Sequence, residues 1–279
     1  MIKNIFKRIL KKILRICTEG NSGNSDITKA YFSTKEKQML LKMPRYSEGK
    51  IKMKNLNFNF SDSIGFLHSF DEIFVEEVYR FESDKKSPLI IDCGSNVGLS
   101  ILYFREKFPE AKIIGFEADN KIFNLLKNNI SQFYNSDKIQ ILKKAVWTKD
   151  TILTFFTEGS LAGSLNIDFA GNNAKEKVQA VDFKKYLKEE VDFLKIDIEG
   201  AENELIFNIK EDLKNVKNLF LEYHGLINEK QNLGDILNLL SDVGFEYYIR
   251  LAGETLKYPF CKETPKKFNQ QLNIFCFRK

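Results

Sequence analysis

The sequence predicts an α/β fold in which a mostly parallel sheet carries helices on both faces. The short run LIIDC at residues 89–93 is almost fully apolar, as expected of a strand buried in a parallel sheet. Residues 97–107 follow with apolar side chains at helical spacing and stop before Pro109. Strand-like and helix-like segments keep alternating toward the carboxyl terminus, which is the pattern of a parallel sheet between two helical layers.

The predicted elements follow one another in a regular order. Strands are expected at residues 89–93, 112–117, 138–142, 151–156, 192–197, 218–224, 244–251 and 272–277. Helices are expected at residues 97–107, at 120–134, from Ala201 onward, and at 230–242. Ligands of such sheets bind at the carboxyl ends of the strands. The chemistry is therefore expected just after residues 92, 117, 197 and 222.

Composition excludes several classes of protein. The chain has 279 residues, and its 43% hydrophobic content is enough to build a core, which argues against global disorder. No apolar run reaches the 18 or more residues of a membrane-spanning helix. The four cysteines have no CxxC spacing, which argues against a disulfide scaffold or zinc ribbon and favours a reducing, cytoplasmic location. The two histidines, His68 and His224, are too few for a mechanism based on a histidine cluster.

The positive charge is concentrated at the amino terminus. Residues 1–17 hold six of the 43 basic residues and no acid, so the rest of the chain has 37 basic against 38 acidic residues, a net charge of −1. A body without basic excess argues against nucleic acid as a partner. The cations alternate with isoleucines at helical spacing, which predicts a short amphipathic helix. This helix is expected either to bind an anionic membrane from the inner face, or to pack on the protein's own body or a second subunit. The sequence leaves the oligomeric state open.

Three domains are expected along the chain. Residues 1–30 comprise the basic helix and a linker, EGNSGNSD at 19–26. Residues 31–85 form an N-terminal elaboration with a hairpin and a lead-in helix, the latter within residues 66–81. Residues 86–279 form the main α/β domain.

The first strand exit reads Asp92-Cys93-Gly94-Ser95-Asn96-Val97-Gly98. Gly94 permits a tight turn, and Gly98 is expected to let the backbone approach a ligand. The spacing is neither the GxGxxG of dinucleotide sites nor a phosphate-binding P-loop, which argues against a nicotinamide dehydrogenase. The carboxylate of Asp92 would repel a phosphate but suits a cationic group, such as the amino or sulfonium group of S-adenosylmethionine.

The second strand exit supplies an acid for a ribose. Glu117 lies 23 positions after Gly94, close to the distance at which an acidic residue accepts from two ribose hydroxyls. Together the two exits predict a nucleoside cofactor without phosphates.

Five segments resemble the motif series of FkbM-type methyltransferases: DCGSNVGLS, GFEAD, KAVW at 144–147, DFLKIDIEGAE at 192–202 and LEYH at 221–224. The resemblance covers about residues 66–224, and KIDIEGAE is its most specific part. It implies a class I, Rossmann-like methyltransferase fold with a mostly parallel seven-stranded sheet. It also implies an enzyme that uses S-adenosylmethionine to methylate hydroxyl groups, often on sugars or polyketides.

The resemblance also implies a set of cofactor-binding residues. They are Asp92, Gly94, Ser95, Asn96, Gly98, Glu117 and Ala118, with Ala145 and Val146 near the adenine. The segments before residue 60 and after residue 225 are expected to determine the acceptor.

Methyl transfer to a sugar hydroxyl needs a group that removes or acidifies the hydroxyl proton. Asp197, Glu199 and Glu202 cluster at one strand exit, and Asp197 is the best candidate for the base; its alternatives are helix capping or cofactor contact. Glu202 is expected to cap or orient. His224, beside Glu222, is either a second candidate base or a structural histidine.

A divalent cation is an alternative to a protein base. Asp197, Glu222 and His224 are ligands suited to Mg²⁺ or Mn²⁺. The glycine-rich stretch at residues 157–175 is either a mobile loop over the acceptor site or a plain surface connection.

These observations predict an S-adenosylmethionine-dependent O-methyltransferase. The favoured acceptor is a hydroxyl of a glycan or glycolipid intermediate at the inner face of a bacterial membrane. The alternatives are methylation of a soluble natural product, or a catalytically silent cofactor-binding scaffold.

Overall fold

The structure is a computed structural model that describes residues 22–156, 175–227, 229–253, 255–261 and 268–278. The chain divides into two compact units, Met1–Arg80 and Phe81–Lys279. The basic segment 1–17 and most of the glycine-rich stretch lie outside the described residues. No helix in the described part of the chain has the length and apolar character needed to cross a membrane.

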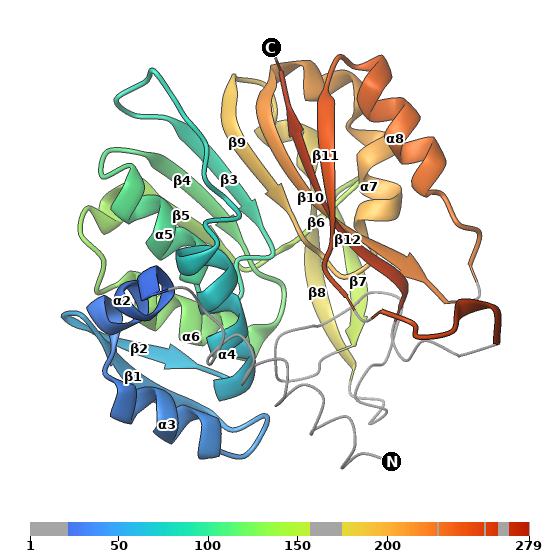
Figure 1. Ribbon diagram of the computed structural model, residues 1–279. Coiled ribbons are helices and arrows are strands. Elements are labelled where there is room, and N and C mark those ends of the chain that lie inside the picture. The colour runs from blue at the N-terminus through green and yellow to red at the C-terminus, as the bar shows by residue number, and fades with distance from the viewer. Residues whose placement is uncertain (1–21, 157–174, 228, 254, 262–267, 279) are drawn as a thin grey trace. The chain divides into compact units, whose positions relative to one another are not determined.

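The second unit is built on a seven-stranded sheet (Figure 1), whose strands have the order β11-β12-β10-β9-β3-β4-β5. The strands are β3 (Leu89–Cys93), β4 (Lys112–Phe116), β5 (Ile139–Leu142), β9 (Val191–Ile196), β10 (Val216–Leu226), β11 (Glu246–Leu251) and β12 (Phe268–Phe277). Strand β12 runs antiparallel to both of its neighbours, and the other pairs are parallel. The expected mostly parallel seven-stranded sheet is therefore confirmed.

Helices cover both faces of this sheet. They are α5 (Leu99–Lys107), α6 (Asn120–Ile130), α7 (Glu202–Asn208) and α8 (Leu233–Asp242). Leu194 of β9 belongs to a core cluster that includes Leu205 of α7 and Ile236 of α8. Its neighbour Phe193 leaves the sheet on the opposite face, where its ring lies 5.2 Å from that of Phe104 in α5. The predicted class I arrangement, with a helical layer on each face, is confirmed.

The side on which successive strands join the sheet reverses at β3. From β3 the chain adds β4 and then β5 on one side, and later adds β9 and then β10 on the other. The gap between the carboxyl ends of β3 and β9 is thus the topological switch point, where parallel sheets bind ligands.

A second sheet in this unit corrects one expectation. Strand β7 (Thr151–Phe156) forms where predicted, but it pairs with β8 (Lys175–Asp182) instead of joining the main sheet. Strand β6 (Ala145–Trp147) completes this three-stranded sheet. Strand β8 was not predicted, because its sequence KEKVQAVD is mostly polar and lacks a continuous apolar run.

The first unit packs aromatic side chains around a hairpin. Strands β1 (Gly49–Met53) and β2 (Leu56–Phe60) pair antiparallel, which is the hairpin expected within residues 31–85. Helix α3 (Thr34–Lys42) begins at a capping box formed by Ser33 and Glu36. The lead-in helix starts earlier than predicted and is shorter, with α4 (Ser63–Phe70) continuing as a π-helical turn, Asp71–Val75.

Helix α2 (Ser22–Tyr31) begins inside the segment 19–26 that composition marked as a linker, so that expectation was wrong for its second half. The ring of Tyr31, at the end of this helix, lies 5.2 Å from Phe70 and 4.8 Å from Phe74. Tertiary packing of this kind outweighs the low helix propensity of the serines, glycine and asparagine.

Candidate functional site

The residues singled out in the sequence lie at the carboxyl ends of four strands. The glycine loop, residues 94–98, follows β3. Glu117 follows β4, and Asp197 and Glu199 follow β9. His224 differs slightly from the expectation, because it lies within β10, two positions before the strand's last residue, and pairs with Gln271 of β12.

The glycine loop is shaped by the chain's own packing. Gly94 has a φ of +85°, and a Cβ atom there would lie 1.9 Å from the carbonyl oxygen of Asp197. Gly98 has a φ of +92°, and its Cβ would lie 2.8 Å from Cδ1 of Leu126 in α6. Both glycines are therefore required before any ligand binds, whereas the sequence suggested that Gly98 serves the approach of a ligand.

The backbone amides of this loop are used internally. Gly94 and Ser95 both donate to the carbonyl oxygen of Phe116, and Gly98 donates to that of Ser95. Asn96 N donates to Glu117 Oε2 at 2.9 Å, and Val97 N donates to the side chain of Asn96. No amide from residue 94 to residue 98 is left to cradle a phosphate, so the loop is unlike an anion-binding turn.

Glu117 sits against the glycine loop, as expected. One carboxylate oxygen accepts from Asn96 and the other accepts from the backbone N–H of Asp119 at 2.9 Å. Burial raises the pKa of Glu117 to about 7. Each carboxylate oxygen keeps a lone pair that can accept another hydrogen bond.

Asp92, in β3, and Ser95, within the loop, are both buried. Asp92 Oδ2 accepts from Ser100 Oγ at 2.6 Å, and Asp92 Oδ1 lies 3.3 Å from Nζ of Lys195. Ser95 Oγ donates to the carbonyl oxygen of Asp92 at 3.0 Å. The contacts of these two residues thus hold the loop in place, and their polar atoms are occupied by other groups of the protein.

Lys195 is a residue that the sequence analysis missed. Its side chain is 3% exposed, and its Nζ donates to the carbonyl oxygen of Gly94 at 2.9 Å. The same atom lies 3.2 Å from Asp197 Oδ2 and also pairs with Asp92. A lysine within the fully buried strand β9 was the available signal, because a buried ammonium group needs partners.

The expected adenine-side residues lie near the second sheet. Ala145 of β6 belongs to a small buried cluster with Val178 and Ala180, and Ala118 packs against it. Val146 faces the other way, into the main core. Ala118 and Ala145 are therefore brought together, and Val146 is not with them.

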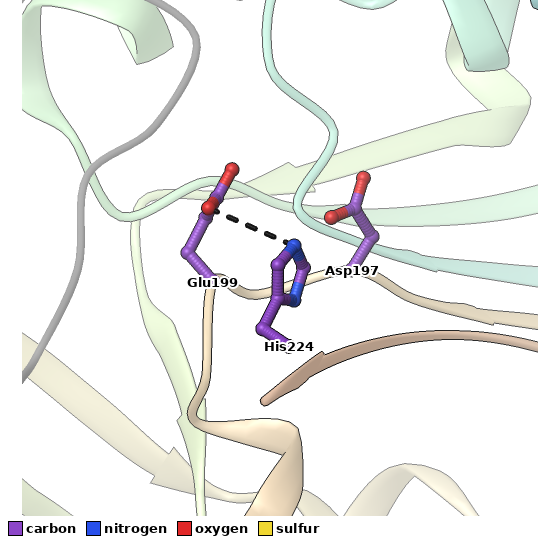
Figure 2. A group of neighbouring side chains, drawn as sticks. All are labelled: Asp197, Glu199 and His224. Atoms are coloured by element: carbon purple, nitrogen blue, oxygen red, sulfur yellow. Dashed lines mark ion pairs between the residues drawn. The ribbon is translucent and has the colours of Figure 1, made fainter. Parts of the chain in front are cut away.

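Three titratable side chains converge at the exit of β9 (Figure 2). One ligand-type atom from each of Asp197, Glu199 and His224 lies within 4.8 Å of the other two. His224 Nε2 lies 3.7 Å from Glu199 Oε2. Glu199 and Gly200 both have left-handed backbones, with φ of +54° and +103°, which is a strained turn for a glutamate.

Glu202 contacts His224 on the Nδ1 side of the imidazole ring. His224 and Glu202 are both fully buried, and His224 Nδ1 lies 2.9 Å from Glu202 Oε1, which also accepts the backbone N–H of His224. The other oxygen of Glu202 accepts from Gly200 N at 2.9 Å. Burial lowers the pKa of His224, but Glu202 and Glu199 raise it more, so the net pKa lies well above the usual value.

Glu222 approaches the same histidine from β10. Its Oε1 lies 3.8 Å from His224 Nε2 and accepts from Gln271 Nε2 at 2.5 Å. Burial, followed by the nearby charge of Asp197, raises the pKa of Glu222 well above its usual value. His68 belongs to the first unit, where it is half-exposed on α4 and its Nδ1 lies 3.2 Å from Glu72 Oε2.

Known proteins resemble this chain at the level of family and fold. "Methyltransferase 1" of Beauveria bassiana is 23% identical over 207 residues, which cover 65% of this chain and 81% of that protein. "Methyltransferase sdnD" of Sordaria araneosa is 23% identical over 177 residues, covering 51% and 68%.

Among solved structures, Methyltransferase FkbM from Methylobacillus flagellatus aligns with a TM-score of 0.44 and 14% identity, covering 76% of this chain and 52% of that one. This chain therefore spans about half of that protein. M. jannaschii TYW2 in complex with AdoMet aligns with a TM-score of 0.44 and 12% identity, covering 85% and 89%.

The Methyltransferase FkbM domain matches residues 92–247, which is more than half of the chain and includes the glycine loop, Glu117, Lys195 and the Asp197–Glu199–His224 cluster. The chain therefore belongs to the FkbM methyltransferase family.

Proposed function

We propose that this methyltransferase takes its methyl group from S-adenosylmethionine and transfers it to a hydroxyl oxygen. One observation carries the proposal: Lys195 joins the glycine loop to the Asp197–Glu199–His224 cluster. Its Nζ lies 2.9 Å from the carbonyl oxygen of Gly94 and 3.2 Å from Asp197 Oδ2. A donor bound over the loop would thus have its reactive end beside Asp197.

The loop suits a nucleoside donor without phosphates. Its amides are all used internally, and the carboxylate of Glu117 stands where a phosphate would be repelled. The same carboxylate has lone pairs for two ribose hydroxyls. This disfavours a nicotinamide dinucleotide and supports S-adenosylmethionine, which supplies an electrophilic methyl group on a positively charged sulfur.

The cluster at β9 suits the acceptor side of the reaction. The acceptor O–H bond must break as the new O–C bond forms, and the proton must leave. Asp197 and Glu199 are 25% and 20% exposed, so both reach the site, whereas His224 is buried behind them. Lys195 holds one oxygen of Asp197, which leaves the other to face an acceptor hydroxyl.

The proposed acceptor is a sugar hydroxyl of a glycan or glycolipid intermediate. Its support is the family motif series together with the basic amino terminus. A test is transfer of labelled methyl from S-adenosylmethionine to separated pools of glycolipid, soluble glycan and small molecules. Label in the small-molecule pool alone would replace this acceptor by a soluble natural product. Binding of the donor with no transfer to any pool would indicate a scaffold.

Replacing Glu117 with alanine is expected to weaken binding of S-adenosylmethionine by about 100-fold or more, because two charge-assisted hydrogen bonds are lost at about 1.5–3 kcal/mol each. Calorimetry measures this affinity directly. Glu189→Ala, an exposed site at the amino end of β9, is the matched control and should leave the affinity unchanged. An unchanged affinity in Glu117→Ala would remove the ribose assignment.

The same assignment predicts a pH dependence. The free protein holds Glu117 with a pKa of about 7, and the ionised carboxylate is the form that accepts from the ribose. Affinity should therefore rise with pH through about 7, by at most ~10-fold per unit below it, and level off above it. Glu117→Gln should flatten this profile; a flat profile in the unchanged protein would contradict the assignment.

We further propose that residues 1–17 bind an anionic bilayer, on the strength of their six cations and apolar stripe. Deleting residues 1–20 should abolish flotation with anionic vesicles and leave donor affinity unchanged. Binding should also weaken with salt, since the Debye length falls from about 10 Å at 0.1 M to about 3 Å at 1 M. A lower melting temperature after deletion, without vesicle binding before it, would favour packing on the protein itself.

A further inference from the structure

We propose that Asp197, Glu199 and His224 bind one divalent cation that prefers oxygen ligands, of the Mg²⁺ or Mn²⁺ class. The cation would orient and acidify the acceptor hydroxyl, and in this use the inference rests on the proposed function. The sequence alone suggested Asp197, Glu222 and His224 as a set. In the structure Glu199 is the third member of the cluster, and Glu222 Oε1 lies 3.8 Å from His224 Nε2.

The first support is the distance between the three ligand atoms. They lie within 4.8 Å of one another. Ligand atoms on a cation with bonds of about 2.0–2.3 Å are separated by roughly 3–4.5 Å. Since Asp197 and Glu199 are partly exposed, small side-chain rotations bring both carboxylates onto one ion.

The second support is the orientation of His224. Glu202 Oε1 accepts a hydrogen bond from Nδ1–H of His224, which turns Nε2 toward the carboxylates (Figure 2). In histidines that bind metals, the N–H of the other ring nitrogen commonly donates a hydrogen bond to a carboxylate in this way. Gln271 Nε2 lies 3.3 Å from His224 Nε2, a longer contact than its 2.5 Å bond to Glu222, and a cation would replace this weak contact.

The third support is independent of these three residues. Asn273 is 7% exposed, and its Oδ1 has no hydrogen-bond partner among the described residues. Asn273 is directly opposite Glu222 in the β10–β12 register, so the two side chains leave the same face of the sheet, and His224 is two positions along on that face. A buried acceptor of this kind is suited to a water molecule bound to the cation.

The charge of the cluster also favours a cation. The carboxylates of Asp197 and Glu199 and the carboxyl group of Glu222 gather around the His224 imidazole. Lys195 neutralises Asp197 only in part, because it is shared with Asp92. Two carboxylate oxygens and one imidazole nitrogen are hard to borderline ligands, and within this class Mn²⁺ binds more tightly than Mg²⁺ at such mixed sites.

The test is binding of Mn²⁺ to the full chain, measured by electron paramagnetic resonance without donor or acceptor. We expect one Mn²⁺ per chain. Glu199→Gln should weaken its binding by at least ~10-fold, and Glu202→Gln, which only orients His224, by about 10–100-fold. Glu189→Gln is the surface control and should bind as the unchanged protein does. Thermal melts of each variant establish that it is folded.

Two results would overturn the cation site. One is binding of Mn²⁺ no tighter in the unchanged protein than in folded Glu199→Gln. The other is methyl transfer that persists undiminished after chelation. In either case the proposed function would stand if the donor still binds and labelled methyl is still transferred.

The converse outcome is distinguishable. Glu117→Ala should lose affinity for S-adenosylmethionine and bind Mn²⁺ normally. If the unchanged protein binds Mn²⁺ at this site but never binds S-adenosylmethionine, the proposed function fails and the cation site remains.

Discussion

Asp197→Asn is expected to lower methyl-transfer turnover by about 10²–10⁴, a typical range for losing a group that handles a proton in the transition state. The amide keeps the shape of the side chain but cannot accept the hydroxyl proton, and it is a poor ligand for a cation. Affinity for S-adenosylmethionine should stay within a few-fold, because Glu117 and the glycine loop are unchanged. Single-turnover kinetics with labelled donor, alongside calorimetry, separate the two effects.

Asp235→Asn provides the control, since Asp235 lies exposed on α8 and pairs with Lys230 at 3.8 Å. It should retain full turnover. Full turnover in Asp197→Asn would leave His224 as the remaining candidate, and full turnover in His224→Ala as well would mean that the reactive centre lies elsewhere.

Lys195→Met is expected to lower the free energy of unfolding by about 3–5 kcal/mol, the cost of removing one partner of a buried ion pair. The substitution leaves Asp92, which is fully buried, without its countercharge. It also removes the bond that Lys195 donates to the carbonyl oxygen of Gly94. Urea unfolding followed by circular dichroism measures the loss.

The matched control is Lys188→Met, which breaks a pair with Asp212 at the surface and should change the unfolding midpoint little. In the double variant Asp92→Asn/Lys195→Met, part of the lost stability should return, because the buried charge is gone. A Lys195→Met protein as stable as the unchanged one would show that the lysine is not needed to balance Asp92.

The sequence predicts the main sheet well because its strands are recognisable locally. LIIDC and KIIGF are dense in apolar residues, and such runs form buried strands wherever they pair. Strand β8 was not predicted because Val178, Ala180 and Val181 are its only apolar residues, and they do not form a continuous apolar run. Its stability depends on pairing with β6 and β7, which the sequence does not reveal.

In the candidate site too, some features could be predicted locally and others depend on contacts between distant residues. Asp197, Glu199 and His224 could be placed together because strand ends of a parallel sheet meet at one edge. The role of Glu202 toward His224 is a contact between residues 22 positions apart, and that of Lys195 toward Gly94 spans 101. Contacts over such separations depend on strand order. The sequence alone therefore could not distinguish Glu199 from Glu222 as the third member of the cluster with Asp197 and His224.

The contact between Gly94 and the carbonyl oxygen of Asp197 has an evolutionary consequence. A side chain at Gly94 would collide with the backbone that presents Asp197, and Lys195 ties both to Asp92. The glycine loop and the carboxyl end of β9 must therefore be inherited as one block, because mutating either alone damages the other. Relatives that act on different acceptors are expected to have diverged in segments outside this block. An engineered change of acceptor should accordingly leave residues 92–98 and 195–197 untouched and vary the rest.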